Sequence, residues 1–358
     1  MLLFIVRKLM YGLLVMAGII SIVFFLFNVL PGDPARMMLG QRADVSGIDA
    51  INKELGRDQP LMKQFVLYIN DLSPFSLHNV KDSSSHSFLD KSKYGRVVTL
   101  IHAGDYTLLL KQPYLRRSYQ SKQKVSEILA DALPGTALLA FVALLFAAFV
   151  GIALGVWSAL KHGTWSDYSS MLLAVLGMSV PSFFAGIIIA WLFGFVWSKY
   201  THLDMTGSLY VIDPFEGPKL QLKNLILPAI TLGIRPLAVI VQLTRSSMLE
   251  VMGMDYIRTA RAKGLSKNVV IVHHALRNSL NPVLTAISGW FGSLLAGAVF
   301  IEYIFNWKGI GKVTVDALEF YDFPVVMGSV LMVSLFFVLI NIITDIFYGL
   351  LDPRVRNS

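Results

Sequence analysis

The sequence predicts an all-α polytopic membrane protein with about six transmembrane helices and a small extracytoplasmic α/β insertion after the first helix. Of its 358 residues, 55% are hydrophobic and only 15% are charged, whereas soluble domains average about 25% charged residues. The mean hydropathy is +0.61. Several apolar segments also reach the roughly 20 residues that a helix needs to cross a bilayer. Lipid is therefore the expected solvent for most of the chain.

The first membrane helix is predicted over residues 1–31. Arg7 and Lys8 precede an apolar run from Leu9 to Leu30. This run is longer than the hydrophobic region of a typical signal peptide, and no small-residue cleavage site follows it. We therefore expect a retained helix that enters from the cytoplasm and ends where Pro31-Gly32-Asp33-Pro34 breaks it.

A polar segment over residues 32–132 is expected to form the extracytoplasmic domain. Ser46 to Leu55 has helical spacing. The serine-rich tract from Lys81 to Lys93 is typical of a flexible loop. The β-prone runs Arg96 to Ile101 and Tyr106 to Leu110, with a short polar connection between them, predict a hairpin.

The membrane core is predicted over residues 133–350, with a cytoplasmic tail over 351–358. Its spans are expected at 133–160, 169–197, 225–244, 282–304 and 324–350. With the first helix they make six, and an even number returns the C-terminus to the side of the N-terminus. Basic residues gather in the loop 249–281, so the positive-inside rule places this loop and both termini in the cytoplasm.

Composition argues against several kinds of chemistry. The chain has no cysteine, which excludes disulfides and thiolate metal sites. Its net charge of +8 is better explained by anionic lipid than by nucleic acid. His273 and His274 are adjacent and point apart on a helix, so no metal site is expected. The nearest approach to a phosphate-binding loop, Gly309 to Lys312, has Asn306 and Val313 where the motif requires a glycine and a hydroxyl residue. We therefore expect no cofactor on this chain, and any ATP would be used by partners.

The cytoplasmic loop contains the most informative pattern. Small and apolar residues between Ile257 and Gly264 share one helical face, with basic residues on the flank. Gly264 can adopt the positive φ that a reversal requires. A second amphipathic run from Val269 to Leu280 then leads to Pro282. A helix, a turn and a helix would thus project from the membrane, where they could dock on a partner; a solvated basic loop is the alternative.

This loop resembles the coupling loop of ABC importer permeases, whose motif is Glu-Ala-Ala, three residues, Gly, nine residues, Ile, one residue, Leu-Pro. Aligned on Gly264, the chain keeps Leu276 but has Arg-Thr-Ala for Glu-Ala-Ala, His274 for Ile and Arg277 for Pro. Arg-Thr-Ala-Arg-Ala-Lys-Gly followed by His-Ala-Leu-Arg-Asn resembles the dipeptide and oligopeptide branch of the family.

Resemblance to that branch covers nearly the whole chain. The other matching motifs are Leu30 to Pro34, Asp58 to Leu61, Val180 to Phe184, Leu227 to Ala229, Thr244 to Met248, Glu302 to Phe305, Gly309 to Gly311 and Asp352 to Arg354. Each is weak by itself, but their order is specific. The stretch from about 80 to 118 is longer than the branch pattern, and we hypothesise that it docks a receptor.

The resemblance implies a non-catalytic permease subunit of the bacterial inner membrane that imports di- or oligopeptides. Its implied partners are a second, related permease forming a heterodimer, two cytoplasmic ATPases that use ATP and Mg, and an extracytoplasmic solute-binding protein. Glutathione, nickel chelates and sugars remain open as solutes. The implied ATPase-coupling residues are Asp255, Tyr256, Arg258, Thr259, Ala260, Arg261, Ala262, Lys263, Gly264 and Leu265.

Candidates for the translocation path are Arg235, Pro181 and Ser182. A charge within a span costs roughly 2.5 to 3.5 kcal/mol on insertion scales, so Arg235 should face protein or water. It could contact a substrate carboxylate, although a structural hydrogen bond to neighbouring helices is the preferred interpretation. Pro181 and Pro228 are expected to kink their spans, as fixed shape or as part of a gate.

Two further positions are interpreted structurally. Gly151 and Gly155 form a small-xxx-small pair that favours close helix packing. Asp345 in the last span is expected to make a cap or an interhelical bond rather than to transfer protons.

Three other classes of function remain open at this point. A secondary transporter should show inverted repeats and several intramembrane carboxylates, of which there is little sign. A membrane-embedded enzyme needs clustered polar residues at catalytic spacing, and those present are scattered. A membrane scaffold would not need the helix-turn-helix protrusion.

Overall fold

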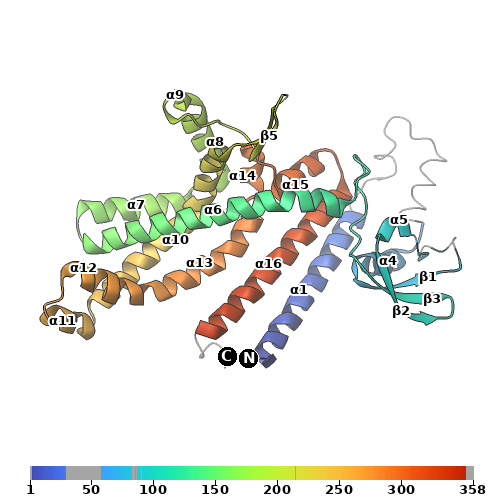
Figure 1. Ribbon diagram of the computed structural model, residues 1–358, viewed down its shortest axis with the longest axis horizontal. Helices are drawn as coiled ribbons and strands as arrows, with labels where there is room; N and C mark the ends of the chain where they lie inside the picture. The colour runs from blue at the N-terminus through green and yellow to red at the C-terminus, as the bar shows by residue number, and fades with distance from the viewer. Residues whose placement is uncertain are drawn as a thin grey trace. The chain divides into compact units, whose positions relative to one another are not determined.

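The computed structural model describes residues 2–29, 58–82, 85, 87–89, 91–213 and 215–351 (Figure 1). Contacts divide the chain into two compact units. The first contains residues 1–12, 132–312 and 335–358, and the second contains 13–131 and 313–334. The predicted helix from Ser46 to Leu55 and the residues after Leu351 lie outside the described part of the chain. The domain boundaries expected from the sequence remain predictions.

Four helices in the described residues are long and apolar enough to cross a membrane, or five if one bent pair counts as a single span. The four are α1 (Leu2–Val29), α6 (Val125–Leu160), α10 (Ile226–Met252) and α16 (Phe323–Leu351). Their length and composition confirm the predicted class of helical membrane protein.

The predicted span at 169–197 is not one straight helix. It consists of α7 (Trp165–Ser179), α8 (Ser182–Trp191) and a π-helical turn, η2 (Leu192–Val196), and its two halves meet at an angle of 110°. Val180 is extended, and Pro181 follows it with φ of −58° and ψ of 135°. Pro181 causes the break, because proline lacks an N–H and disfavours helical backbone in the preceding residue.

The segment predicted as a span at 282–304 forms α13 (Arg277–Gly297) and α14 (Val299–Ile304). These helices are not among the candidate spans of the described chain, so six spans remain a prediction. Pro282, to which the second amphipathic run leads, lies inside α13. A proline removes one backbone hydrogen bond without ending a helix when neighbouring groups compensate.

Pro228 does not kink α10, contrary to expectation. It is the third residue of this helix, where its missing N–H would have no intrahelical partner. The interior proline of α10 is Pro236.

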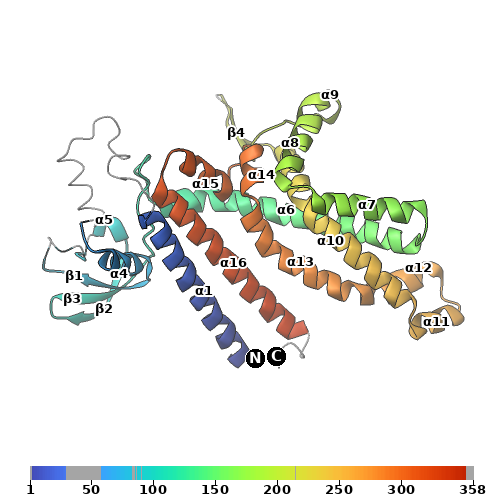
Figure 2. The ribbon, with the colours of Figure 1, turned by 180° about the vertical axis from the view of Figure 1, so that it is seen from behind.

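Helix α10 is central in the first unit, where it contacts α7, α8, α13 and α14 (Figure 2). A Cβ atom on Gly151 of α6 would lie 2.8 Å from Ile240 Cγ2, and one on Gly155 would lie 2.5 Å from Thr244 Cβ. The predicted packing role of these two glycines is therefore confirmed. Asp345 of α16 forms an ion pair with Lys8 of α1 at 2.7 Å, which confirms the interhelical bond.

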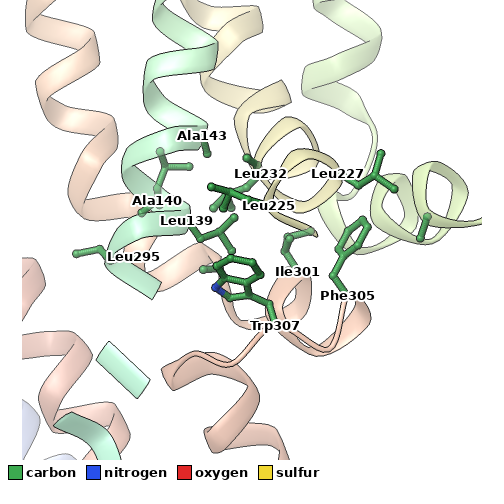
Figure 3. Packing of buried hydrophobic residues seen from close by; sticks show 14 residues of the cluster. Leu139, Ala140, Ala143, Leu225, Leu227, Leu232, Leu295, Ile301, Phe305 and Trp307 are labelled. Carbon is green, nitrogen blue, oxygen red and sulfur yellow. The ribbon is translucent and has the colours of Figure 1, made fainter. Parts of the chain in front are cut away.

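The largest apolar core of the first unit gathers side chains from α6, α10 and the segment around α14 (Figure 3). Trp307, Phe305 and Ile301 are fully or almost fully buried there, and the indole of Trp307 donates to the carbonyl of Gly135 at 3.0 Å. Short elements complete the unit: α9 (Ser198–Thr201), the hairpin β4 (Tyr210–Asp213) and β5 (Gly217–Leu220), and η3 (Leu222–Leu225).

The second unit holds a three-stranded antiparallel sheet in the order β1-β3-β2. Its strands are β1 (Phe75–Asn79), β2 (Val97–Ala103) and β3 (Tyr106–Lys111), with α4 (Leu61–Leu72) and α5 (Lys91–Tyr94) beside them. The predicted hairpin is confirmed as β2 and β3, and β1 is an additional strand that sequence reasoning missed.

Two helix ends complete the second unit. Helix α6 begins at Val125, eight residues before the start at 133 that the sequence predicts. Its first turns are stabilised because Val125 and Leu129 are buried against Gly328 of α16. Asp322 precedes α16 and accepts hydrogen bonds from the hydroxyl of Ser118 and the amide of Tyr119. Helix α15 (Ile310–Glu319) spans the border between the two units.

Candidate coupling site

The predicted cytoplasmic helix is α11 (Asp255–Ala262). It starts after Met254, whose backbone is extended, and Asp255 places a carboxylate in the first turn, where the helix dipole favours negative charge. The hydroxyl of Thr259 donates to the carbonyl of Asp255 at 3.0 Å. Arg258 lies 3.4 Å from the Asp255 carboxylate, but both side chains are exposed, so this pair contributes little stability.

One face of α11 is packed on the first unit's own core. Ile257 is fully buried and Ala260 almost so. They join a cluster contributed by α6, α10 and the π-helical segment η4 (Val270–Leu276), whose buried members are Ala159, Met248, Val251, Val270 and Ala275. The helix is therefore held against the ends of two candidate spans.

A left-handed glycine ends α11 as predicted. Gly264 has φ of +78°, a region that a Cβ atom disfavours. Its N–H donates to the carbonyl of Arg261, and the N–H of Leu265 donates to that of Ala260. These bonds close the helix and reverse the chain into α12 (Lys267–Val269), which continues as η4. The second amphipathic run of the sequence is thus partly π-helical.

Nine of the ten predicted coupling residues are exposed on one protrusion. They are Asp255, Tyr256, Arg258, Thr259, Arg261, Ala262, Lys263, Gly264 and Leu265, whereas Ala260 is buried beneath them. Across the loop, the amide of Asn278 donates to the hydroxyl of Tyr256 at 3.0 Å. The arrangement presents a basic outer surface on a helix whose inner surface is anchored.

A charged cluster that sequence reasoning missed lies on the same side of the first unit. Arg245 of α10 donates from Nε to Asp167 Oδ1 at 2.6 Å and from a terminal nitrogen to Oδ2 at 2.8 Å. Asp167 also accepts from the Ser158 hydroxyl at 2.5 Å and from the Gly163 amide at 3.1 Å, and the His162 ring lies 3.2 Å from it. Its carboxylate is 1% exposed.

This cluster ties the turn between α6 and α7 to α10. Ser158 and Arg245 are close in sequence to Ala159 and Met248, which contact α11 through the apolar cluster. The sequence signals were the arginine in Thr244 to Met248 and an aspartate beside a turn, but nothing in the sequence paired them.

The segment Gly309 to Lys312, which superficially resembles a phosphate-binding loop, surrounds a carboxylate of this chain. Glu302 is fully buried and accepts from the amides of Gly311 at 2.7 Å and Lys312 at 3.2 Å. A Cβ atom on Gly309 would lie 2.3 Å from the Glu302 carboxyl group. The glycines therefore make room for an internal acid.

The three candidates for the translocation path lie on different elements. Pro181 caps α8, and Ser182 is its first residue. Arg235 lies on α10, just before Pro236, and is exposed. No hydrogen bond or ion pair joins Arg235 to another residue in the described ranges, so the structural bond expected for it is not formed there.

Comparison with known proteins decides the family. Residues 151–357 match the family model described as binding-protein-dependent transport system inner membrane component. Residues 1–92 match the model of the N-terminal part of such membrane components. The chain belongs to this family of membrane transport permeases. The resemblance identified in the sequence is therefore confirmed.

Full-length relatives are similar throughout. The chain is 37% identical to a di/tripeptide transport system permease protein of Pseudomonas aeruginosa and 36% identical to a dipeptide transport system permease protein of Escherichia coli, in both cases over 100% of each chain. It is 33% identical to a glutathione transport system permease protein of Escherichia coli over 99% of each chain. A solved structure titled as an amino acid ABC transporter with histidines aligns at 12% identity and a TM-score of 0.42, covering 62% of this chain and 93% of that one.

Membership makes the chain a transport permease rather than an enzyme. It also accounts for the motifs at both ends of the sequence, because the two matches cover the first apolar helix and the segment that contains α11. Residues 93–150, which include β2 and β3, lie outside both matches.

Proposed function

We propose that this permease translocates di- or oligopeptides across the bacterial inner membrane as one subunit of an ATP-driven ABC importer. Three relatives named above carry names for dipeptide, di/tripeptide or glutathione transport. All these solutes are short peptides with at least one carboxylate. A short peptide is therefore the substrate class that the relatives support.

The arrangement of α11 carries the proposal. Its outer surface is exposed and basic, while Ile257 and Ala260 seat it on the ends of α6 and α10. A partner that binds the outer surface and moves would displace those helices together, because close-packed side chains transmit displacement with little compression. The exposed residues of the protrusion are the proposed docking surface for the ATPases.

The remaining subunits follow from this assignment. Two cytoplasmic ATPases would hydrolyse ATP with Mg, and this chain would supply neither. A related permease would complete a heterodimer, and an extracytoplasmic solute-binding protein would deliver the peptide. The loop containing α11 and both termini would then lie in the cytoplasm.

Arg235, Pro181 and Ser182 are proposed to border the translocation path. Arg235 is exposed on a helix that is otherwise largely buried in this chain, and a guanidinium in lipid costs roughly 2.5 to 3.5 kcal/mol. Water or a peptide carboxylate would remove this penalty. We expect Arg235→Ala to lower peptide uptake and Arg235→Lys to retain part of it; unchanged uptake by the alanine variant refutes a substrate role.

The coupling assignment is tested by reversing charge on the exposed surface of α11. The variant Arg258→Glu/Arg261→Glu leaves the buried face intact, whereas Ala260→Glu would bury a charge and unfold the loop. We expect the permease to insert in the membrane but to retain less co-purified ATPase. Peptide-stimulated ATP hydrolysis should fall by about tenfold or more, as interface charge reversals cost several kcal/mol.

Lys161→Glu is the matched control, because Lys161 is also exposed and basic but lies on the turn between α6 and α7. It should retain ATPase binding and stimulation. Equal behaviour of the two variants, or the absence of any ATPase from the purified wild type, contradicts the coupling role and favours a secondary transporter.

A further inference from the structure

The three-stranded sheet of the second unit has an inverted distribution of polarity. Residues that face each other across the strands share one face of the sheet. The face of β1, β3 and β2 that points away from α4 and α5 is mostly apolar: beside Asn79 at one end, it carries Phe75, Leu77, Tyr106, Leu108, Leu110, Val98 and Ile101. Six of these seven side chains are exposed, among them Phe75 and Ile101 at 60% each.

The opposite face is mostly polar; its residues on β1 and β3 are buried, whereas Thr99 and His102 on the edge strand β2 are exposed. Its buried members on β1 and β3 are Ser76, His78, Thr107, Leu109 and Lys111. The polar groups find partners inside the unit: the His78 ring lies 3.1 Å from the Ser76 hydroxyl, and Lys111 Nζ donates to the carbonyl of Asp71 at 2.5 Å. A domain surrounded by water normally has the reverse arrangement.

Contacts with α1 set the level of this sheet relative to the bilayer. Phe24 is fully buried, and its ring lies 5.1 Å from that of Phe65 and 5.3 Å from that of Tyr68, both on α4. Phe24 belongs to the candidate span Leu3–Asn28. At 1.5 Å per residue it lies roughly 6 Å before the end of that span, so α4 is packed at the depth of the boundary between acyl chains and headgroups.

The sheet is attached directly to α4. The side chain of Asn70 accepts from the amide of Leu77 at 2.8 Å and donates to its carbonyl at 3.0 Å, which joins β1 to the helix. Both ribbon views draw the strands alongside α1 rather than beyond its C-terminal end (Figures 1 and 2). The apolar face is therefore held close to the level of the outer leaflet.

We propose that this apolar face lies on the outer leaflet of the membrane and anchors the extracytoplasmic unit to lipid. A surface that docks a soluble protein partner usually contains both polar and apolar groups, since protein interfaces are only about 56–58% apolar. The seven side chains include no charge. This uncharged, apolar surface lies at the same depth as the C-terminal end of the candidate span α1. It is therefore suited to contact lipid at the boundary between acyl chains and headgroups.

The absence of cysteine from the chain permits a direct test. Val98→Cys places a single thiol on the apolar face, and Thr99→Cys places one on the opposite face of the same strand. Each full-length variant is labelled with a nitroxide and reconstituted in nanodiscs of phosphatidylethanolamine and phosphatidylglycerol. Collisions with oxygen, which concentrates in lipid, are compared with collisions with a water-soluble nickel chelate.

At Val98 we expect oxygen accessibility to exceed nickel accessibility several-fold, and at Thr99 we expect the reverse. Ile101→Cys and His102→Cys repeat the comparison further along β2. Equal access of the nickel chelate at both faces would show that the apolar face is in water and overturns the proposal. Exclusion of both probes from Val98 would show that protein covers the face, which overturns it equally.

Discussion

The buried carboxylate of Asp167 provides the sharpest test of how the turn between α6 and α7 is held to α10. Asp167→Asn keeps the size of the side chain but removes its charge. The two hydrogen bonds from Arg245, at 2.6 and 2.8 Å, lose their ionic character, and the arginine, whose side chain is 20% exposed, loses its counter-charge. The amide group also supplies one acceptor oxygen where the carboxylate supplied two.

Breaking a buried ion pair by removing one partner costs about 3–5 kcal/mol. For a chain of this size that corresponds to a fall in Tm of about 4–7 °C. The assay is thermal unfolding of the purified permease followed by tryptophan fluorescence. Trp157 is a local reporter, because its indole donates to the hydroxyl of Ser166 at 2.7 Å, beside the cluster.

Asp255→Asn is the control. It removes the carboxylate of the exposed pair with Arg258, and we expect a change of less than about 1 kcal/mol. If Asp167→Asn and Asp255→Asn shift the Tm by the same small amount, the cluster does not hold α7 to α10 and this reasoning is wrong.

Three further predictions concern other parts of the structure. Gly155→Leu should prevent close packing of α6 on α10, because even a Cβ atom would lie 2.5 Å from Thr244; the yield of folded protein in size-exclusion chromatography should fall well below that of the Gly18→Leu control, since Gly18 is exposed on α1 and a Cβ atom there would meet no atom within 4 Å. Gly264→Ala should cost about 1 kcal/mol because of its positive φ, and protease cleavage after Lys263 should accelerate. Gly253→Ala, at a negative φ, should leave this rate unchanged. Burial lowers the pKa of Lys111 to about 8, so the folded state releases its proton before the unfolded chain does. The unit's stability should therefore rise between about pH 8 and pH 10, and this rise should vanish in Lys111→Met.

Local patterns were sufficient for much of the loop containing α11. The spacing of Ile257 and Ala260 predicted that they share one face of a helix, and the glycine at 264 predicted the reversal, since both depend on residues within two helical turns. That Ala260 is buried within this chain, rather than exposed for a partner, was not predicted. The prediction that Gly151 and Gly155 allow close helix packing was also correct, because a glycine pair four residues apart leaves a smooth helix surface.

Apolar runs misled the prediction where they contained a break. The segment from 169 to 197 is apolar enough for one span, but Pro181 divides it into two helices at 110°. Pro228 is harmless because α10 begins only two residues before it. A proline's effect depends on its position within the helix, and that position is set by helix ends, which the sequence specifies least well.

By itself the sequence determined that the chain is a helical membrane permease, because hydrophobic length, basic loops and the order of short motifs are properties of consecutive residues. Only the tertiary structure joined Asp167 to Arg245, placed the glycines at 309 and 311 around Glu302, and turned the apolar face of the sheet outward. Each of these depends on residues distant in the chain or on which face of an element is covered. Alternation along a strand separates two faces, but it does not say which one the neighbouring helices will bury.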